Sequence, residues 1–280
     1  MPESCWKKIV LFCSLFCVSF DLAAESGLHQ KHWEIGPEVY HAAYEEPGVM
    51  KEDGVMYGLK GAIEFHDIIP GPVDMLRAEA SYTWGEQDYT SDWTGDIDDI
   101  ETSVFEVRGL LGRDIQFSGG VLTPYTGFGY RWKKDHAGGM VSTSGALGYD
   151  RESNYYYSPF GVAVMADLEK GWSIGGSFEY DLFWDGTQKS FFSELHPLNS
   201  DLENDQNDGY GLRASLRVAK ELDETFLIVL EPFWRYWDID QSEPGVYDEY
   251  NAFLGRVVQK TGYEPENSST EYGVNIILLF

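Results

Sequence analysis

The sequence ends on EYGVNIILLF, Glu271 to Phe280, in which apolar residues recur at every second position. Successive side chains of a β-strand point to opposite faces, so a strand here would have one purely apolar face, while the other begins with Glu271, Gly273 and Asn275. The apolar face comprises Tyr272, Val274, Ile276, Leu278 and Phe280. Such a face belongs either in a protein core or against lipid, and the rest of the chain decides between them.

The composition excludes two classes of protein. The chain has 280 residues, 47 of them acidic and 20 basic, with a formal net charge of -27. Nucleic-acid binding is disfavoured, because no basic stripe is present to replace the counterions of the phosphates. Beyond residue 24 no apolar run has the length of a spanning helix. We therefore expect no nucleic-acid partner and no helical membrane anchor.

Residues 1–24 have the layout of a secretory signal peptide. Two lysines precede an apolar stretch, residues 9–20, and the small residues Ala23 and Ala24 end the segment. All three cysteines of the chain lie within it. We predict cleavage there and an exported domain, residues 25–280, without a disulfide framework, a thiolate metal site or a cysteine nucleophile.

The exported part shows about ten segments with period-2 alternation and no helical stripe. The expected strands are residues 32–45, 54–66, 73–86, 102–113, 120–133, 153–166, 171–184, 209–220, 224–238 and 270–280. Short connections alternate with long ones, which grow from about 8 residues to about 30 in the last, 241–269; this pattern is typical of outer-membrane barrels, with turns in the periplasm and loops outside. The sequence predicts an all-β fold, a transmembrane antiparallel up-and-down barrel of about 10 strands in the cell outer membrane.

The strand faces support this prediction. Trp172 and Trp184 end an apolar row of one expected strand. Twelve residues of strand, tilted near 40°, cover about 30 Å of height, close to the apolar band of such a barrel between two aromatic girdles.

The opposite faces carry charges of both signs, which we expect to pair across a narrow lumen. The expected inward residues are nine acids and seven bases: Glu34, Glu38, Lys60, Glu64, Arg77, Glu79, Glu106, Arg108, Arg131, Glu179, Asp181, Arg213, Arg217, Glu231, Arg235 and Glu271. Such a lumen is mostly filled by its own side chains. Alternation is blurred in the first strand by Pro37 and in the sixth by NYYYSPF, residues 154–160, and a register slip of one residue there would turn the opposite face inward.

The last strand must pair with the first to close a barrel. Tyr272, Ile276, Leu278 and the terminal Phe280 also resemble the signal by which outer-membrane proteins are recognised by the barrel-assembly machinery. We therefore expect a lipid-facing closing strand that doubles as an assembly signal.

Two loop segments contain residue types that could carry chemistry. Asp96, Asp98 and Asp99 cluster as the aspartates of an omptin-like surface protease would. Glu194 and His196 could share one face of a strand, whereas the adjacent Asp135 and His136 would point to opposite faces. Nothing in the sequence places Glu194 and His196 opposite the aspartates. We therefore assign no catalytic residue, and solvated loops are the alternative interpretation.

The segment DLENDQNDGYG is a candidate divalent-cation loop through Asp201, Glu203, Asp205 and Asp208. It lacks the glycine at position six and the glutamate at position twelve of an EF-hand loop. A plain solvated acidic loop is the alternative. We expect no cofactor and assign no metal.

Five segments together resemble poorly characterised outer-membrane β-barrel proteins of Gram-negative bacteria: EEPGVMKEDGVMYGL, FEVRGLLGRDI, TPYTGFGYRW, GYDRESNYYYSPFGV and FEYDLFWDGTQKS. The architecture is also distantly similar to that of the omptins. The resemblance implies the fold and the location and no settled activity. Charged residues of these segments suggest an internal ion-pair network near the outer rim: Glu106, Arg108, Arg131, Arg151 and Glu152.

The sequence favours a non-enzymatic surface protein whose acidic outer loops contact ligands, other surfaces or cations bound to lipopolysaccharide. The expected partners are outer-membrane lipid, lipopolysaccharide and the barrel-assembly machinery. A narrow porin and an omptin-like surface protease are the alternatives.

Overall fold

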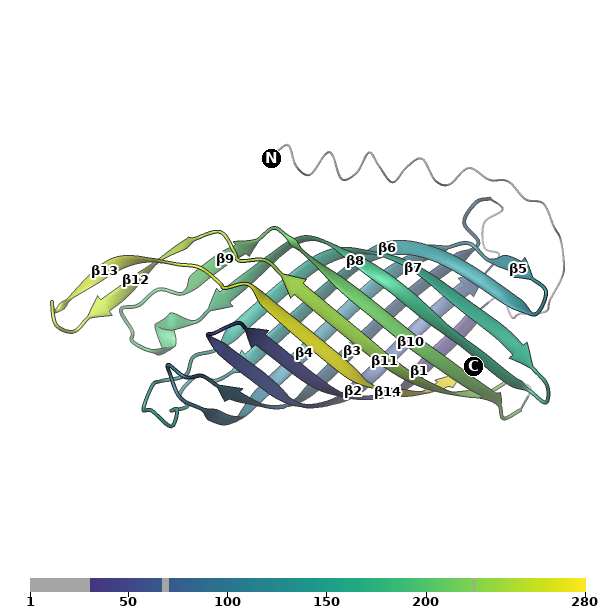
Figure 1. Ribbon diagram of the computed structural model, residues 1–280, viewed down its shortest axis with the longest axis horizontal. Coiled ribbons are helices and arrows are strands. Elements are labelled where there is room, and N and C mark those ends of the chain that lie inside the picture. The colour runs from purple at the N-terminus through teal and green to yellow at the C-terminus, as the bar shows by residue number, and fades with distance from the viewer. Residues whose placement is uncertain (1–30, 67–70, 224) are drawn as a thin grey trace.

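The computed structural model describes residues 31–66, 71–223 and 225–280. The predicted signal peptide lies outside these residues. Long antiparallel strands wrap into a closed barrel whose axis runs along the long dimension of Figure 1. Among the described residues, no helix has the length and apolarity needed to cross a bilayer.

Ten long strands form the wall, which confirms the predicted fold. They are β1 (Lys31–Glu46), β2 (Met50–His66), β3 (Met75–Thr90), β4 (Ile97–Gly112), β6 (Gly120–His136), β7 (Arg151–Leu168), β8 (Trp172–Ser190), β10 (Gly209–Glu221), β11 (Leu227–Ile239) and β14 (Asn267–Leu279). Two short strands extend the same sheet, because β5 (Ile115–Phe117) pairs with β6 and β9 (Leu202–Gln206) continues the line of β10 along β8. A separate two-stranded ribbon is formed by β12 (Gly245–Asn251) and β13 (Arg256–Gly262).

The first and last strands close the barrel. β1 and β14 pair in antiparallel register, for example Val39 with Val274. At the end of this ladder, Trp33 and Phe280 exchange two backbone hydrogen bonds, at 2.7 and 2.9 Å between N and O. The closing stretch of the sequence therefore leaves no open sheet edge between the chain's two ends.

The two ends of the barrel differ. Short turns, such as residues 118–119 and 169–171, lie at the end where the chain terminates, which we call the turn end. The longer segments 137–150, 191–201 and 240–266 lie at the opposite end, the loop end.

The structure corrects the expected connections at the loop end. β1 and β2 continue so far that only residues 47–49 join them, where about 8 residues were predicted. The segment 241–269, expected to be one long loop, contains the β12–β13 ribbon, which projects beyond the barrel (Figure 1). Both faces of this ribbon mix polar and apolar residues, so its sequence lacks the alternation that identifies a wall strand.

Large apolar side chains cover the outside of the wall. Aromatic residues exposed near the turn end are Trp33, Trp172, Phe226 and Phe280. A second exposed set lies toward the loop end: Tyr57, Tyr82, Trp84, Tyr156, Tyr180, Trp184 and Tyr272. The apolar rows expected from the sequence therefore face outward between two belts of aromatic rings.

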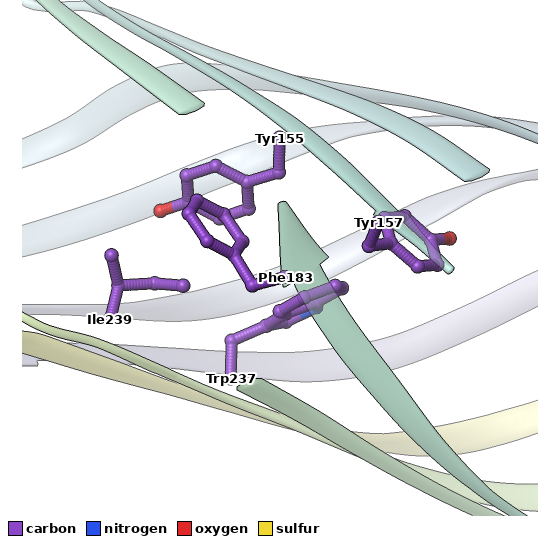
Figure 2. Close-up of a cluster of buried hydrophobic side chains, with 5 residues drawn as sticks. All are labelled: Tyr155, Tyr157, Phe183, Trp237 and Ile239. Atoms are coloured by element: carbon purple, nitrogen blue, oxygen red, sulfur yellow. The ribbon is translucent and has the colours of Figure 1, made fainter. Parts of the chain in front are cut away.

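An aromatic cluster packs inside the lumen, on the loop-end side of mid-height. Figure 2 shows Tyr155, Tyr157, Phe183, Trp237 and Ile239 pointing toward one another. The rings of Tyr157 and Trp237 lie 5.0 Å apart, edge to face, and both side chains are almost fully buried, at 0% and 1% exposure. These residues come from β7, β8 and β11 and form a packed layer on that side of the lumen.

Two glycines allow tyrosines to lie across the inner wall. Gly129 of β6 pairs with Tyr157 of β7, and Gly161 of β7 pairs with Tyr125 of β6. A Cβ atom at Gly129 would lie 2.2 Å from Cζ of Tyr157, and one at Gly161 would lie 2.3 Å from Cζ of Tyr125. Each tyrosine ring therefore occupies the space that a side chain on the neighbouring strand would need.

We expect Gly129→Ala to destabilise the barrel by about 1–3 kcal/mol, because the buried ring of Tyr157 cannot move away from an added methyl group. Gly109→Ala is the matched control, since a Cβ there meets no atom within 4 Å. The measurement is the urea midpoint of unfolding in detergent micelles. Equal midpoints for the two variants would contradict the packing described here.

Candidate functional site

The inward-facing charges form the most developed polar site of the described chain. Every one of the residues expected from the sequence to face inward is buried or half-buried and belongs to at least one ion pair. We call this set the lumen network. Its pairs join strands that are remote in the sequence, so the network crosses the barrel.

Arg77 of β3 organises the part of the network nearest the turn end. Its guanidinium contacts Glu34 at 2.7 Å, Glu64 at 2.8 Å and Glu79 at 3.0 Å. Three carboxylates from β1, β2 and β3 thus share one planar cation, the geometry that suits arginine better than lysine.

Two further cations tie β10 and β11 to this layer. Nη2 of Arg217 lies 2.7 Å from Glu34, and Nζ of Lys60 lies 3.2 Å from Glu231. Glu231 also accepts a hydrogen bond of 2.9 Å from Nδ2 of Asn275. The side chains of six strands, β1, β2, β3, β10, β11 and β14, are therefore linked in one layer.

Arg213 of β10 lies at mid-height. Its Nε contacts Asp181 at 2.6 Å and its Nη1 contacts Glu106 on β4 at 3.0 Å. Tyr157 donates a hydrogen bond to the same Glu106, and its ring and that of Trp237 lie 5.3 and 5.6 Å from the guanidinium of Arg213. The ion pairs and the aromatic cluster thus meet at one residue.

The remaining residues of the lumen network lie at mid-height with Arg213, and together with it they form what we call the middle layer. Arg235 contacts Glu38 at 2.6 Å and Glu271 at 2.7 Å, and Glu271 also pairs with Arg131. Arg108 bridges Glu79 and Glu179. Side chains from opposite walls are joined through these contacts, because each charge that leaves water requires a partner.

A cavity of about 1290 Å³ occupies the lumen on the turn-end side of the middle layer. It reaches from Asp223 and Phe280 at the turns to Glu106, Arg213 and Arg235 at its inner end. A smaller cavity on the loop-end side, lined in part by Arg131 and Tyr155, has about 40 Å³, room for one or two water molecules. The lumen of the described chain is therefore wide on one side of the middle layer and filled on the other.

A second charged cluster at the loop end was not expected as a unit. Nη2 of Arg151 lies 2.6 Å from Glu46 and also contacts Glu264. The hydroxyl of Tyr44 lies 3.0 Å from Glu46 and 3.1 Å from Glu264, and its one proton is shared between these two acceptors. Glu264 precedes β14, so this contact ties the segment behind the ribbon to the barrel wall.

Lys133 completes this loop-end cluster. Its Nζ lies 2.9 Å from Glu52 and 3.0 Å from Asp135, and Asp135 accepts a hydrogen bond of 2.8 Å from Thr102. The sequence signal was available, since Lys133 and Asp135 continue the inward parity of Arg131 along β6.

The prediction that Glu152 belongs to the internal ion-pair network is wrong. Glu152 does not join Arg151, because adjacent strand residues face opposite sides. Arg151 points inward to Glu46, whereas Glu152 shares the other face with Asn154, which donates it a weak hydrogen bond of 3.4 Å. Tyr155 and Tyr157 share the inward face with Arg151 by the same alternation, and the register irregularity beside them skips Trp184 of the neighbouring strand β8.

The candidate cation residues are not brought together. Asp201, Glu203 and Asp205 lie at alternate positions along or beside β9 instead of in a loop, and Glu203 and Asp205 are exposed. Asp201 accepts a hydrogen bond from the backbone N–H of Ser193, which lowers its pKa against the opposing effect of burial. Among the described residues, no three acidic, histidine or cysteine side chains gather as metal ligands would.

The residues considered for a protease also lie apart. The loop that carries Asp96 packs on residues 137–150 through Thr143, with a 2.9 Å hydrogen bond from the Asp96 N–H to Oγ1. Glu194 instead accepts a bond of 2.9 Å from the N–H of Asp150, and His196 stacks on Tyr250. Asp98 and Asp99 are exposed, so the structure shows no facing aspartate and histidine pair among these residues.

The C-terminal residues expected to form an assembly signal lie on the outer face of β14. These exposed side chains are Tyr272, Ile276, Leu278 and Phe280. Their even spacing therefore presents one continuous apolar row.

Comparison with known proteins places the fold. The structure is similar to that of the outer membrane protease OmpT from Escherichia coli, with a TM-score of 0.65 and 14% identity over 92% of this chain and 99% of that one. The translocator domain of the autotransporter NalP from Neisseria meningitidis gives a TM-score of 0.41 and 12% identity, covering 88% of each chain. No family model and no curated protein matches the sequence. The predicted distant architectural similarity to omptins is confirmed, and at this identity it concerns the fold alone.

The Glu264 contact predicts that the base of the ribbon is held more tightly at low pH. Burial raises the pKa of Glu264 to about 7; Arg151 opposes this rise and the carboxylate of Glu46 adds to it. A released segment would titrate near the ordinary value of 4.5. The extra stability of the seated form is therefore complete below pH 4.5 and is lost as the pH rises through about 7.

Hydrogen exchange of residues 240–266, corrected for the intrinsic exchange rate, measures this effect. We expect roughly tenfold stronger protection at acid than at alkaline pH. Glu264→Gln should abolish most of the difference, while Glu266→Gln, which changes an exposed neighbour, should retain it. The same pH profile in all three proteins would refute the assignment.

Proposed function

We propose that this protein is an integral barrel of the bacterial outer membrane that does not conduct ions, has no enzymatic activity of its own, and uses its acidic loops to contact ligands at the cell surface. The turn end faces the periplasm and the loop end faces outward in this proposal. The C-terminal strand is recognised by the barrel-assembly machinery, and the wall contacts lipid and lipopolysaccharide.

The outer surface supports the location. Apolar rows lie between two aromatic belts, the arrangement that matches a bilayer with its two interfaces. A closed barrel leaves no unpaired backbone edge in the hydrocarbon region. The shared fold with OmpT agrees with this placement.

One observation supports the absence of conduction above all others. Arg213, Glu106 and Tyr157, from β10, β4 and β7, meet in the lumen directly beneath the buried Trp237. A hydrated ion would have to separate paired charges and buried rings to pass this layer. The filled lumen therefore favours a closed barrel over the narrow porin.

The loop end supports a role in surface contact. Residues 86–101 include seven acids and no lysine or arginine, and residues 238–249 include five acids and no base. Potentials of one sign over such a surface attract cations and basic ligands over distances near the Debye length. Cations bound to lipopolysaccharide and basic groups on other surfaces are the ligand chemistry that fits.

Conductance of the refolded protein in a planar bilayer tests the proposal. We expect no steady conductance from the unmodified barrel. A reproducible cation-selective current from folded protein would overturn the proposal in favour of a small porin.

The variant Arg108→Ala distinguishes a lumen network that stabilises the barrel from one that conducts ions. Without the guanidinium, Glu79 and Glu179 each lose an ion-pair partner. The loss of one partner of a buried ion pair lowers the free energy of unfolding by about 3–5 kcal/mol. We expect a lower urea midpoint and continued electrical silence. Arg256→Ala, at an exposed position of β13, should change stability by no more than about 0.5 kcal/mol. A stable Arg108→Ala barrel with altered conductance would contradict the filled-lumen role.

A further inference from the structure

The β12–β13 ribbon is the element farthest from the barrel. It pairs from Gly245 with Gly262 to Asn251 with Arg256, and its turn at residues 252–255 lies at one extreme of the molecule in Figure 1. No other described strand pairs with β13. The ribbon therefore holds its turn well away from the wall.

The base of the ribbon is firmly attached. Nδ2 of Asn204 donates hydrogen bonds to the carbonyl oxygens of Glu243, at 3.0 Å, and Gly262, at 3.1 Å. The N–H of Glu264 donates to Oγ of Ser242 at 2.8 Å. Both strands of the ribbon are thus fixed to β9 and to each other where they leave the barrel.

Aromatic contacts support the middle of the ribbon. The ring of Tyr247 lies 5.0 Å from that of Phe192, and the ring of Tyr250 stacks on His196 at 4.3 Å. Both partners belong to the segment between β8 and β9. The ribbon is supported up to Tyr250, so only its distal turn stands clear of the barrel.

That turn displays apolar side chains. Phe253 is 96% exposed and Leu254 is 50% exposed, so two large apolar side chains lie side by side at the end of the ribbon. The N–H of Leu254 donates to Oδ1 of Asn251 at 3.0 Å, and Gly255 takes a φ of +61°, which suits glycine. The turn therefore presents Phe253 in a defined, preorganised conformation.

The charge of the turn is opposite to that of its surroundings. Residues 250–263 contain no acid and two bases, Arg256 and Lys260, whereas residues 238–249 contain five acids and no base. Lys260 pairs with Glu249 at 2.5 Å, but Arg256 beside the turn is exposed. The distal end of the ribbon is thus apolar and basic on an acidic loop end.

We propose that residues 252–256 form a membrane-contacting tip, in which Phe253 and Leu254 enter the interface of an anionic lipid surface and Arg256 contacts its headgroups. The lipid belongs to a second membrane that faces the cell, because the ribbon points away from the barrel's own apolar belt. This inference rests on the proposed display of the loop end at the cell surface.

A lipid surface fits this tip better than a protein pocket does. A stable protein interface covers about 800 Å² on each partner, whereas the exposed apolar part of the tip is two side chains. A lipid interface accepts a convex apolar point without a matching shape. Anionic headgroups attract nearby arginine and lysine side chains, which gives the basic flank a role.

Vesicle flotation tests the tip directly. The refolded protein, held in phosphatidylcholine nanodiscs, is mixed with vesicles of phosphatidylcholine and phosphatidylglycerol and centrifuged on a density gradient, with empty nanodiscs as background. We expect the unmodified protein to float with these vesicles and to bind pure phosphatidylcholine vesicles more weakly. Absence of flotation above background would overturn the proposal, including the case in which the tip instead binds a protein.

Matched variants test which side chains of the tip bind lipid. Phe253→Ser combined with Leu254→Ser should weaken binding by about tenfold or more, because burial of apolar area drives insertion. Arg256→Glu should weaken binding to anionic vesicles and reduce its salt dependence. Leu198→Ser, which removes a 54% exposed apolar residue elsewhere on the loop end, should bind as the unmodified protein does.

Equal binding by the tip variant and the unmodified protein would overturn the proposal, as would an equal loss in the Leu198 variant. Heat-modifiable migration on gels verifies that each variant is folded. The bilayer conductance of the same preparations tests the proposed function separately. A conducting barrel with a lipid-binding tip would refute only the closed lumen, and a silent barrel without lipid binding would refute only the tip.

Discussion

The hydrogen-bond ladder between β1 and β14 is the constraint on which the rest of the structure depends. Without it two strands would be left with unpaired N–H and C=O groups, which a hydrocarbon environment does not tolerate. Closure with ten strands also fixes a narrow interior. The inward side chains of opposite walls then come within reach of one another, so the lumen network follows from the closure of the sheet.

The interior combines two kinds of packing at different heights. Paired charges cross the lumen from the turn end to mid-height, and the aromatic cluster covers them on the loop-end side. Buried ion pairs are weak contributors to net stability compared with apolar packing, but the loss of one partner is costly. Arg213 belongs to both parts, because it pairs with Glu106 and lies against the rings of Tyr157 and Trp237.

Alternation in the sequence predicted the wall because lipid requires an apolar row on one face while the lumen accepts charge on the other. It identified Arg77 and Glu231 as inward residues; their partners depend on register and barrel width, which the sequence does not state. Beyond the aromatic belts both faces are polar, and there the prediction failed: it missed β12 and β13 and began the second strand at residue 54 instead of Met50. Glu152 was misplaced because it was grouped with Arg151 by charge and not by parity.

The glycine and tyrosine pairs of β6 and β7 have a consequence for how these strands find each other. In the native register Tyr157 lies opposite Gly129 and Tyr125 opposite Gly161. A slip of two residues in one direction would set Tyr125 against Pro159, and in the other against Ala163. Only the native alignment places both tyrosine rings opposite a glycine. Backbone hydrogen bonds alone would permit several registers, so the steric fit of the two rings selects one of them.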